Sequence, residues 1–421
     1  MADARKKRFA VIGLGNRGLG AFAKGIVGYP GKGPAIFREH AELVALCDSN
    51  RNRVAVARQE LGIDVAEYTD LDAMLAEADF DILVIATRDD THVDVAEKAF
   101  AAGKSVICEK PMATTVADCD RMIAASQRAG RWLRIAQNMR YGPGSAKAAE
   151  MIHNGVVGRP MVVTFEEYLD VDHGADYFRR WHRRKENSGG LLIHKACHHF
   201  DWLNWLIGGQ IQRVAAFGDT SFYLPRPDRG QRCDTCQYKA TCRFAYDLRG
   251  KWDGLYKRMY MDGESADGYV RDGCVWDPQI NIEDRVVVIG EYDNGVKLNY
   301  TLSAFNSREG HSCVVIGDRG RLEVGGKHIH VYPMHKPEHH TIEMLPAKGG
   351  HGGADVALLR SIILEEDSVQ GQRADGHVGR HAVLVGSMAN KALEEERIVL
   401  ASEFGTPPVS PAPVPASRAT A

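Results

Sequence analysis

A glycine-rich turn near the N-terminus has the residues to bind the phosphates of a dinucleotide. The segment Gly13-Leu14-Gly15-Asn16-Arg17-Gly18 follows an apolar run at 9–12 and precedes a stretch with helical spacing. In that context the first glycine permits a tight turn, the second admits a pyrophosphate and the third allows close helix–strand packing. Asp48 follows the second predicted strand, where a carboxylate can hold ribose hydroxyls. NAD is the expected cofactor, and NADP stays open because Arg51 and Arg53 lie nearby.

The ends of two further predicted strands carry polar residues. Thr87 and His92 follow the strand predicted at 82–86, and Glu109 and Lys110 follow the strand predicted at 105–108. Residues at the carboxyl ends of parallel strands line the ligand crevice of such a sheet. A lysine held at that edge is well placed for proton transfer, so we expect Lys110 to be catalytic.

A histidine-rich segment follows a pair of glycines in the second half of the chain. On one helix His194 and His198 lie four residues apart and share a face, as do Lys195 and His199. Asp201 follows three residues after His198, where its carboxylate could orient that imidazole. We expect His194, Lys195 and His198 to be catalytic. The same spacing could hold zinc, but no glutamate of the metzincin type follows the first histidine, and we assign no metal ligand.

The segment before these histidines is both basic and aromatic, Tyr177-Phe178-Arg179-Arg180-Trp181-His182-Arg183-Arg184-Lys185. Arg179 or Arg180 could clamp an anionic group of a substrate, because a guanidinium matches a carboxylate in two hydrogen bonds. Trp181 and Tyr177 could stack on the face of a sugar. A solvated basic loop explains the same pattern equally well.

Four cysteines fall in or near a polar insertion rich in glycine and proline, residues 225–280. Cys233, Cys236 and Cys242 are spaced Cys-x2-Cys-x5-Cys, and Cys274 follows downstream. Such a group could form part of a structural zinc site. The spacing matches no standard pair of Cys-x-x-Cys knuckles, so free thiols or a local cross-link remain equally compatible.

The elements that must position these residues form two patterns. Apolar strands at 9–12, 43–47, 82–86 and 105–108 alternate with helices, which predicts a doubly wound parallel sheet. After about residue 140 the pattern becomes antiparallel, with one main helix predicted over 190–207. We expect β-strands near 161–165, 214–217, 285–289, 296–302, 313–316 and 328–332. The expected domains are 1–140, 141–403 with its insertion, and a disordered proline-rich tail at 404–421.

The composition excludes several classes of protein. The 421 residues are 44% hydrophobic and 26% charged, which is enough apolar material for a large core. With 53 basic and 55 acidic residues the formal charge is −2, which argues against a general nucleic-acid or membrane-surface binder. Nine cysteines are too few for a disulfide scaffold of this length. We expect a cytoplasmic protein that binds neither nucleic acid nor membrane.

Taken together, these motifs resemble the glucose–fructose oxidoreductase, inositol dehydrogenase and MocA (Gfo/Idh/MocA) family over residues 8 to about 400. The most specific piece is Glu109-Lys110-Pro111. The resemblance implies a Rossmann domain followed by an α+β domain with a large, mostly antiparallel open sheet that supports a homodimer or homotetramer. It implies that Lys110 is the catalytic lysine. It also aligns His198 with the histidine of the family's second motif, which is usually Asp-x-x-x-His after a glycine pair. His194 stands where that motif usually has an aspartate.

The resemblance implies hydride transfer between a ring carbon of a sugar or polyol and NAD, with Lys110 and His198 as acid and base. An alternative is a glycoside hydrolase that oxidises, eliminates, hydrates and reduces with NAD recycled, on glycosides of an acidic sugar. A non-catalytic nucleotide sensor is a third, weaker reading. The expected cofactor-binding residues are Gly13, Gly15, Asn16, Arg17, Gly18, Asp48, Ser49, Thr87, His92, Glu109 and Lys110. The expected substrate-binding residues are Arg140, Tyr141, Arg179, Arg180, Trp181 and His199.

Overall fold

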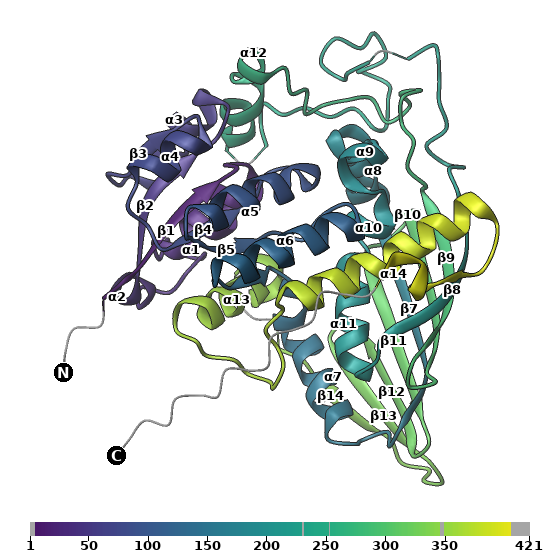
Figure 1. The fold of residues 1–421 in the computed structure, drawn as a ribbon. Helices are drawn as coiled ribbons and strands as arrows, with labels where there is room; N and C mark the ends of the chain where they lie inside the picture. Colours follow the sequence, from purple (N-terminus) through teal and green to yellow (C-terminus); the bar gives the residue numbers. More distant parts are fainter. Residues whose placement is uncertain (1–4, 230, 252, 346–348, 406–421) are drawn as a thin grey trace, which may run out of the picture.

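The computed structural model describes residues 5–229, 231–251, 253–345 and 349–405, so most of the predicted proline-rich tail lies outside the described residues. Two β-sheets, each with its own helices, lie side by side in the molecule (Figure 1). One buried hydrophobic cluster includes residues of both sheets, for example Val106 and Val288. The two halves therefore share a common core.

The first sheet has six parallel strands in the order β3-β2-β1-β4-β5-β6. This order confirms the predicted doubly wound Rossmann arrangement, because the chain moves outward from β1 in both directions. All residues of β4 and β5 are buried, as expected for strands covered on both faces. The strands are β1 (Lys7–Ile12), β2 (Ala41–Cys47), β3 (Ala66–Tyr68), β4 (Ile82–Ile85), β5 (Ser105–Cys108) and β6 (Leu133–Ile135).

Helices connect these strands, and local capping sets where several of them begin and end. The Asn50 side chain accepts from the amides of Asn52 and Arg53 at the start of α3, and Gly62 ends that helix in a left-handed conformation. The glycine- and proline-containing stretch 28–40 ends in the short helix α2. The helical elements are η1 (Gly18–Ala23), α1 (Lys24–Ile26), α2 (Phe37–His40), α3 (Arg51–Leu61), α4 (Leu71–Glu77), η2 (Asp89–Thr91), α5 (His92–Ala101), α6 (Val116–Ala129) and η3 (Asn138–Tyr141).

The second sheet has nine strands in the order β14-β13-β12-β11-β7-β10-β9-β8-β15. It is antiparallel except between β7 and β10, because β7 comes from earlier in the chain and enters the middle of the sheet. The strands are β7 (Pro160–Asp170), β8 (Ile211–Asp219), β9 (Arg285–Tyr292), β10 (Lys297–Asn306), β11 (Gly310–Gly317), β12 (Gly320–Gly325), β13 (His328–Pro333), β14 (His340–Glu343) and β15 (Val399–Leu400). The prediction of a mostly antiparallel sheet is confirmed.

The helix predicted over 190–207 is divided into α10 (Leu191–His194) and α11 (Cys197–Ile207). The break leaves the carbonyl of His194 free to accept a hydrogen bond from the other domain. The remaining helices of this half are α7 (Pro143–His153), α8 (Val171–Arg179), η4 (Trp181–Arg183), α9 (Lys185–Ser188), η6 (Gly350–Gly353), α13 (Ala354–Ile363), α14 (Gly376–Glu395) and η7 (Ala401–Phe404). No helix of the described residues is long and apolar enough to span a membrane.

The predicted insertion joins β8 to β9 and returns toward the Rossmann domain. It contains η5 (Lys257–Met261) and α12 (Glu264–Asp267) but no strand ladder among its described residues. In Figure 1, α12 lies above α3 at the upper edge of the Rossmann domain. The side-chain amide of Asn52, on α3, donates to the carbonyl of Arg258 at 2.6 Å. The insertion therefore contacts the domain that carries the glycine-rich turn.

Candidate active site

Lys110 reaches from the end of β5 to the second domain. Its Nζ donates to the backbone carbonyl of His194 at 3.0 Å. Its charge also acts on the imidazoles of His194, His198 and His182, whose pKa values are lowered first by burial and then by neighbouring cations. The structure thus brings together Lys110, His194 and His198, which the sequence places far apart.

Asp89 and His194 form a buried pair that joins the two domains. The carboxylate oxygen Oδ2 of Asp89 lies 2.5 Å from Nδ1 of His194. Burial raises the pKa of Asp89 and lowers the pKa of His194. Both shifts favour the uncharged form of each group over a full ion pair beside Lys110.

His198 is a neutral imidazole with an unused nitrogen. Its Nδ1 is buried and makes no hydrogen bond to the part of the chain that the structure describes. Burial, then the charges of Lys110 and Lys195, lower its pKa well below the usual value. The expected contact from Asp201 is absent, because the Asp201 carboxylate accepts from Arg140 at 2.6 and 2.8 Å.

Several predicted site residues make structural contacts instead. The Arg140–Asp201 ion pair is fully enclosed, and the Tyr141 hydroxyl donates to Ser361 at 3.2 Å. His199 faces the second sheet, where its Nδ1 lies 2.9 Å from the hydroxyl of Tyr300. These contacts give Arg140, Tyr141 and His199 packing roles that do not need a substrate.

Lys195 lies beside the site as a fixed charge. Its Nζ is 2.9 Å from Glu167, on β7 of the second sheet. Burial works against its charge, but Glu167 outweighs burial and raises the pKa of Lys195 above the usual value. A lysine held protonated in this way is suited to electrostatic support rather than to accepting a proton.

Arg179 and Arg180 point to different surroundings. Arg179 donates to the carbonyl of Phe244 at 2.5 Å and to Sγ of Cys233 at 3.4 Å, inside the insertion. Arg180 donates to Asp176 at 2.9 Å, and its charge acts on Asp89. Arg271, which sequence patterns did not indicate, donates to the same Asp176 at 2.7 Å. Two guanidinium groups thus meet one carboxylate near Lys110, which leaves an excess of positive charge.

Aromatic rings surround His194 on the side of the basic segment. The ring centroids of His182 and Trp181 lie 4.1 and 5.4 Å from that of His194. The Tyr177 centroid lies 5.7 Å away in an edge contact, and burial raises the pKa of Tyr177 to about 12. Rings in this arrangement can line the apolar face of a sugar.

The glycine-rich turn has the shape that a dinucleotide requires. Gly13 has φ +86°, and a Cβ there would stand 2.5 Å from the backbone of Ala86. A Cβ at Gly18 would stand 1.8 Å from the Gly13 carbonyl oxygen, so both positions require glycine. The carboxylate of Asp48 accepts from the Leu14 amide at 2.8 Å at the end of β2. The turn and the carboxylate therefore fit NAD.

Other residues of the predicted cofactor site connect the loops around that turn. Arg17 donates to Glu109 at 2.6 Å and to Asp355 at 3.0 Å, which joins the turn to both domains. His92 is buried, with Nδ1 3.0 Å from the carbonyl of Pro111 and Nε2 3.3 Å from that of Thr87. His92 thus ties together the ends of β4 and β5, and Ser49 is exposed at the end of β2.

The insertion supplies a residue to the glycine-rich turn. The amide of Asn16 donates to the Tyr260 hydroxyl at 3.2 Å, so the insertion contacts the backbone of the turn directly. Arg53 bridges Asp48 at the end of β2 and Asp267 in α12. Tyr260 and Asp267 could not be found from sequence patterns, because they approach the turn only through the fold of the insertion.

The structure adds residues that sequence reasoning missed. Asp89 lies between Thr87 and His92, after the strand predicted at 82–86, so its place at a strand end could have indicated a site residue. His182 lies in the basic and aromatic segment. No motif or spacing in the sequence indicates Arg271 or Tyr260 as site residues. Around Lys110, His194 and His198, no three His, Cys, Asp or Glu side chains of the described residues are grouped to coordinate a metal ion as they stand.

Two family models match most of the chain. The oxidoreductase family model with an NAD-binding Rossmann fold matches residues 7–137. The oxidoreductase family model for a C-terminal alpha/beta domain matches residues 149–400. Both are models of the Gfo/Idh/MocA family, and together they cover both halves of the structure.

Individual proteins agree with these matches. YteT of Bacillus subtilis, described only as an oxidoreductase, is 31% identical over 93% of this chain and 97% of its own. Myo-inositol 2-dehydrogenase of Thermotoga maritima is 24% identical over 87% of this chain and 92% of its own. The WlbA dehydrogenase of Bordetella pertussis, solved with NADH and UDP-GlcNAcA, shares the fold with a TM-score of 0.67 and 21% identity, over 94% of this chain and 99% of that one. The chain therefore belongs to the Gfo/Idh/MocA family of oxidoreductases, and its cofactor is NAD.

Proposed function

We propose that the protein oxidises a hydroxyl group of an acidic sugar, or reduces the matching ketone, with NAD. The observation that carries this proposal is the contact between Lys110 Nζ and the His194 carbonyl, beside the neutral imidazole of His198. A cation and a neutral base side by side, at the strand ends that follow a dinucleotide turn, are the groups that alcohol oxidation needs.

The reaction breaks a C–H and an O–H bond of the substrate. Bound NAD supplies the acceptor for the hydride. The hydroxyl proton must go to a base, and His198 is the neutral imidazole whose Nδ1 makes no hydrogen bond to any described residue. The Lys110 ammonium would hold the reacting oxygen as it becomes a carbonyl. The Asp89–His194 pair would hold the end of α10 against the Rossmann domain, close to both groups.

The acidic character of the substrate is inferred from Arg180 and Arg271. Each donates to Asp176, and the Nε of each is buried and makes no hydrogen bond to a described residue. A carboxylate on the sugar would balance the second guanidinium and accept from these free donors. The neighbouring rings of Trp181 and Tyr177 would pack on the carbon skeleton.

The test is a panel of sugar acids, neutral sugars and inositols with NAD, followed by the absorbance of reduced nicotinamide. We expect the highest kcat/KM with a sugar acid. Replacing Lys110 by Met should lower kcat about 10²–10³-fold, the usual contribution of a donor that stabilises charge on the reacting oxygen. Binding of NAD, followed by fluorescence, should persist.

The matched control is Lys98→Met, which removes an exposed lysine paired with Asp72. We expect this variant to keep its activity. Turnover that survives in Lys110→Met, with NAD bound and a substrate found, would overturn the proposed role of this lysine.

One observation favours a second candidate, an NAD-recycling glycoside hydrolase. Residues of the insertion cover the cofactor turn: Tyr260 on the amide of Asn16, and the Gly263 carbonyl on the side-chain amide of Asn50 at 2.8 Å. A covered cofactor would exchange slowly, which suits a cycle that returns the hydride to the product. Such a cycle oxidises a ring hydroxyl, eliminates the aglycone, adds water and reduces the ketone.

Chromogenic glycosides of sugar acids distinguish the two candidates. Release of the aglycone with NAD well below the substrate concentration, and with no build-up of reduced cofactor, would support the hydrolase. Reduced cofactor that accumulates in step with the product would support the dehydrogenase. The variant Tyr260→Phe should raise the rate of NAD exchange in both cases.

A further inference from the structure

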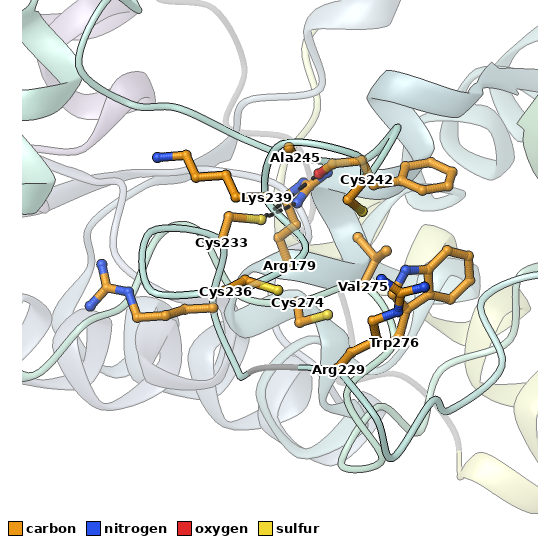
Figure 2. Close-up of a pocket in the computed structure, with 12 residues that line it drawn as sticks. Arg179, Arg229, Cys233, Cys236, Lys239, Cys242, Ala245, Cys274, Val275 and Trp276 are labelled. Carbon is orange, nitrogen blue, oxygen red and sulfur yellow. Dashed lines mark hydrogen bonds between the residues drawn. The ribbon is translucent and has the colours of Figure 1, made fainter.

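We propose that Cys233, Cys236, Cys242 and Cys274 hold one thiophilic metal centre, as a zinc ion or an iron–sulfur cluster. All four line one pocket of the insertion, and Figure 2 shows their sulfur atoms around it. None of the four forms a disulfide. This inference does not depend on the reaction proposed above.

The backbone brings these cysteines together from two distant segments. The amide of Cys233 donates to the carbonyl of Asp272 at 2.9 Å, and the amide of Cys274 donates to that of Gln231 at 2.9 Å. This short antiparallel bridge sets the first and last cysteines on paired segments. The amide of Cys236 then donates to the Cys233 carbonyl at 3.3 Å, so a tight turn presents the first two thiols together.

The charges around the pocket suit a centre held by thiolates. Four thiolates with one Zn²⁺ carry a net charge of about −2, which burial would disfavour without nearby cations. Arg179 donates to Sγ of Cys233 at 3.4 Å, and the side chains of Arg229, Arg232 and Lys239 also line the pocket. Because Arg232 and Lys239 are also paired with carboxylates, Arg179 is the cation that would chiefly balance a thiolate here.

The insertion has little regular secondary structure among its described residues. Residues 220–284 contain two short helical segments and one isolated bridge in their described part. Long segments without secondary structure are uncommon in compact domains, and a metal centre is one device that fixes such a segment. Arg271 lies three residues before Cys274, so the centre would hold this arginine over the candidate active site.

The four sulfurs line the pocket without meeting at one point, since no described group is arranged to coordinate an ion as it stands. In a tetrahedral zinc site the sulfurs approach to about 3.8 Å, from Zn–S bonds of about 2.3 Å. An iron–sulfur cluster fills the space between more widely spaced cysteines. Either centre would draw these loop residues inward when it binds.

The first experiment measures metal and acid-labile sulfide per chain in the full-length protein, purified without oxygen from cells supplied with zinc and iron. About one zinc per chain without sulfide would establish the ion. Iron and sulfide in equal amounts, with visible charge-transfer absorption, would establish the cluster. A protein without either metal, with these thiols free or with a mass two hydrogens lower, would overturn the proposal.

Variants then assign the ligands. Cys236→Ala and Cys242→Ala should each lower the bound metal at least tenfold. The matched control is Cys313→Ala, because Cys313 is a buried cysteine of β11 outside the pocket. Full metal content in Cys236→Ala, or equal loss in all three variants, would contradict the proposed ligand set. Should the ligand variants fold poorly, the metal content of the unmutated protein still decides whether a centre exists.

Discussion

At the scale of single residues, neighbouring arginines have different functions. Arg179 is the last residue of α8 and reaches into the insertion, whereas Arg180 pairs with Asp176 beside the candidate active site. Arg184 follows as a half-buried residue paired with Glu186. The basic segment looks uniform in the sequence, but its arginines differ in role. One supports the insertion, one lies beside the candidate active site, and one pairs with a neighbouring acidic residue.

This division predicts different effects of the same substitution. Arg180→Met should raise KM for a sugar acid about tenfold or more, because a charged donor to the carboxylate is lost, and should change KM for a neutral sugar little. Arg184→Met is the matched control and should change neither value. Steady-state kinetics on both substrates provide the measurement. An equal loss on acidic and neutral sugars would show that Arg180 does not recognise the carboxylate.

Arg140 and Asp201 form the fully buried ion pair, and the pair predicts an effect on stability. Arg140→Met should lower the free energy of unfolding by about 3–5 kcal/mol, because Asp201 would be left buried without its partner. The double variant Arg140→Met with Asp201→Leu should regain most of that loss. Urea unfolding measures both. If Arg140→Met raised KM and left the stability unchanged, Arg140 would bind the substrate, as the sequence analysis expected, and the stability prediction would be wrong.

Which side chains would meet was only partly predictable. Lys110 and His198 could be found because a strand end and a glycine-flanked histidine segment are visible in one sequence. The partners of Arg140 and Arg179 lie 61 and 65 residues away, on elements whose relative positions follow from the whole fold. His199 is adjacent to His198, yet it faces the sheet because consecutive residues of a helix point about 100° apart.

At the scale of elements, the break between α10 and α11 connects the sequence to the site. A continuous helix would have used the His194 carbonyl within its own ladder, whereas the break leaves it for Lys110. The apolar spacing of 190–207 predicted a helix correctly but could not show this interruption. In the same way, strand patterns found most of the second sheet, but not that β7 enters between β10 and β11.

The buried histidines of this region predict a stability that depends on pH. Burial lowers the pKa values of His182, His198 and His199 in the folded protein. Below about pH 6.5 the unfolded chain therefore binds more protons than the folded one, and the free energy of unfolding falls as the pH falls. The raised pKa of Asp89 has the opposite effect on the free energy of unfolding. The folded protein keeps a proton on this carboxyl that the unfolded chain releases as the pH rises.

The variant His182→Phe tests this dependence, since it keeps a ring and removes one titrating group. Between pH 6.5 and 5.5 its free energy of unfolding should fall less than that of the unmutated protein, by up to about 1.4 kcal/mol per pH unit. Urea unfolding at these pH values gives the slope. His340→Gln, at an exposed position, is the control. Equal slopes in all three proteins would disprove the contribution of His182.

At the scale of the whole molecule, polar contacts hold the two domains together around the cofactor turn. Asp355, at the start of α13, accepts from Arg17 of that turn at 3.0 Å and from Asn138 at 2.9 Å. Burial opposes its charge, but His351 and Arg17 lower the pKa of this carboxyl. The insertion adds a second link through Tyr260. The relative position of the domains is therefore fixed at the glycine-rich turn.

The outer face of the second sheet carries the last prediction, that the protein assembles through it. Phe217, Val287 and Ile289 are 73%, 39% and 50% exposed, on the adjacent strands β8 and β9. Phe217 lies directly opposite Val287 in the strand register, so the three form one apolar patch. The buried residues between them, such as Val286 and Val288, face the helices on the other side.

A patch of this kind on an open sheet is typical of an interface between copies of a chain. We expect a homodimer or homotetramer in solution, measured by size-exclusion chromatography with light scattering. Ile289→Lys should shift it to smaller species, because a stable interface buries about 1,000 Å² or more and tolerates no unpaired lysine at its centre. Ile36→Lys, at an apolar residue 37% exposed before α2, should leave the assembly unchanged. A monomeric unmutated protein, or an assembly that Ile289→Lys leaves intact, would show that this face has another use.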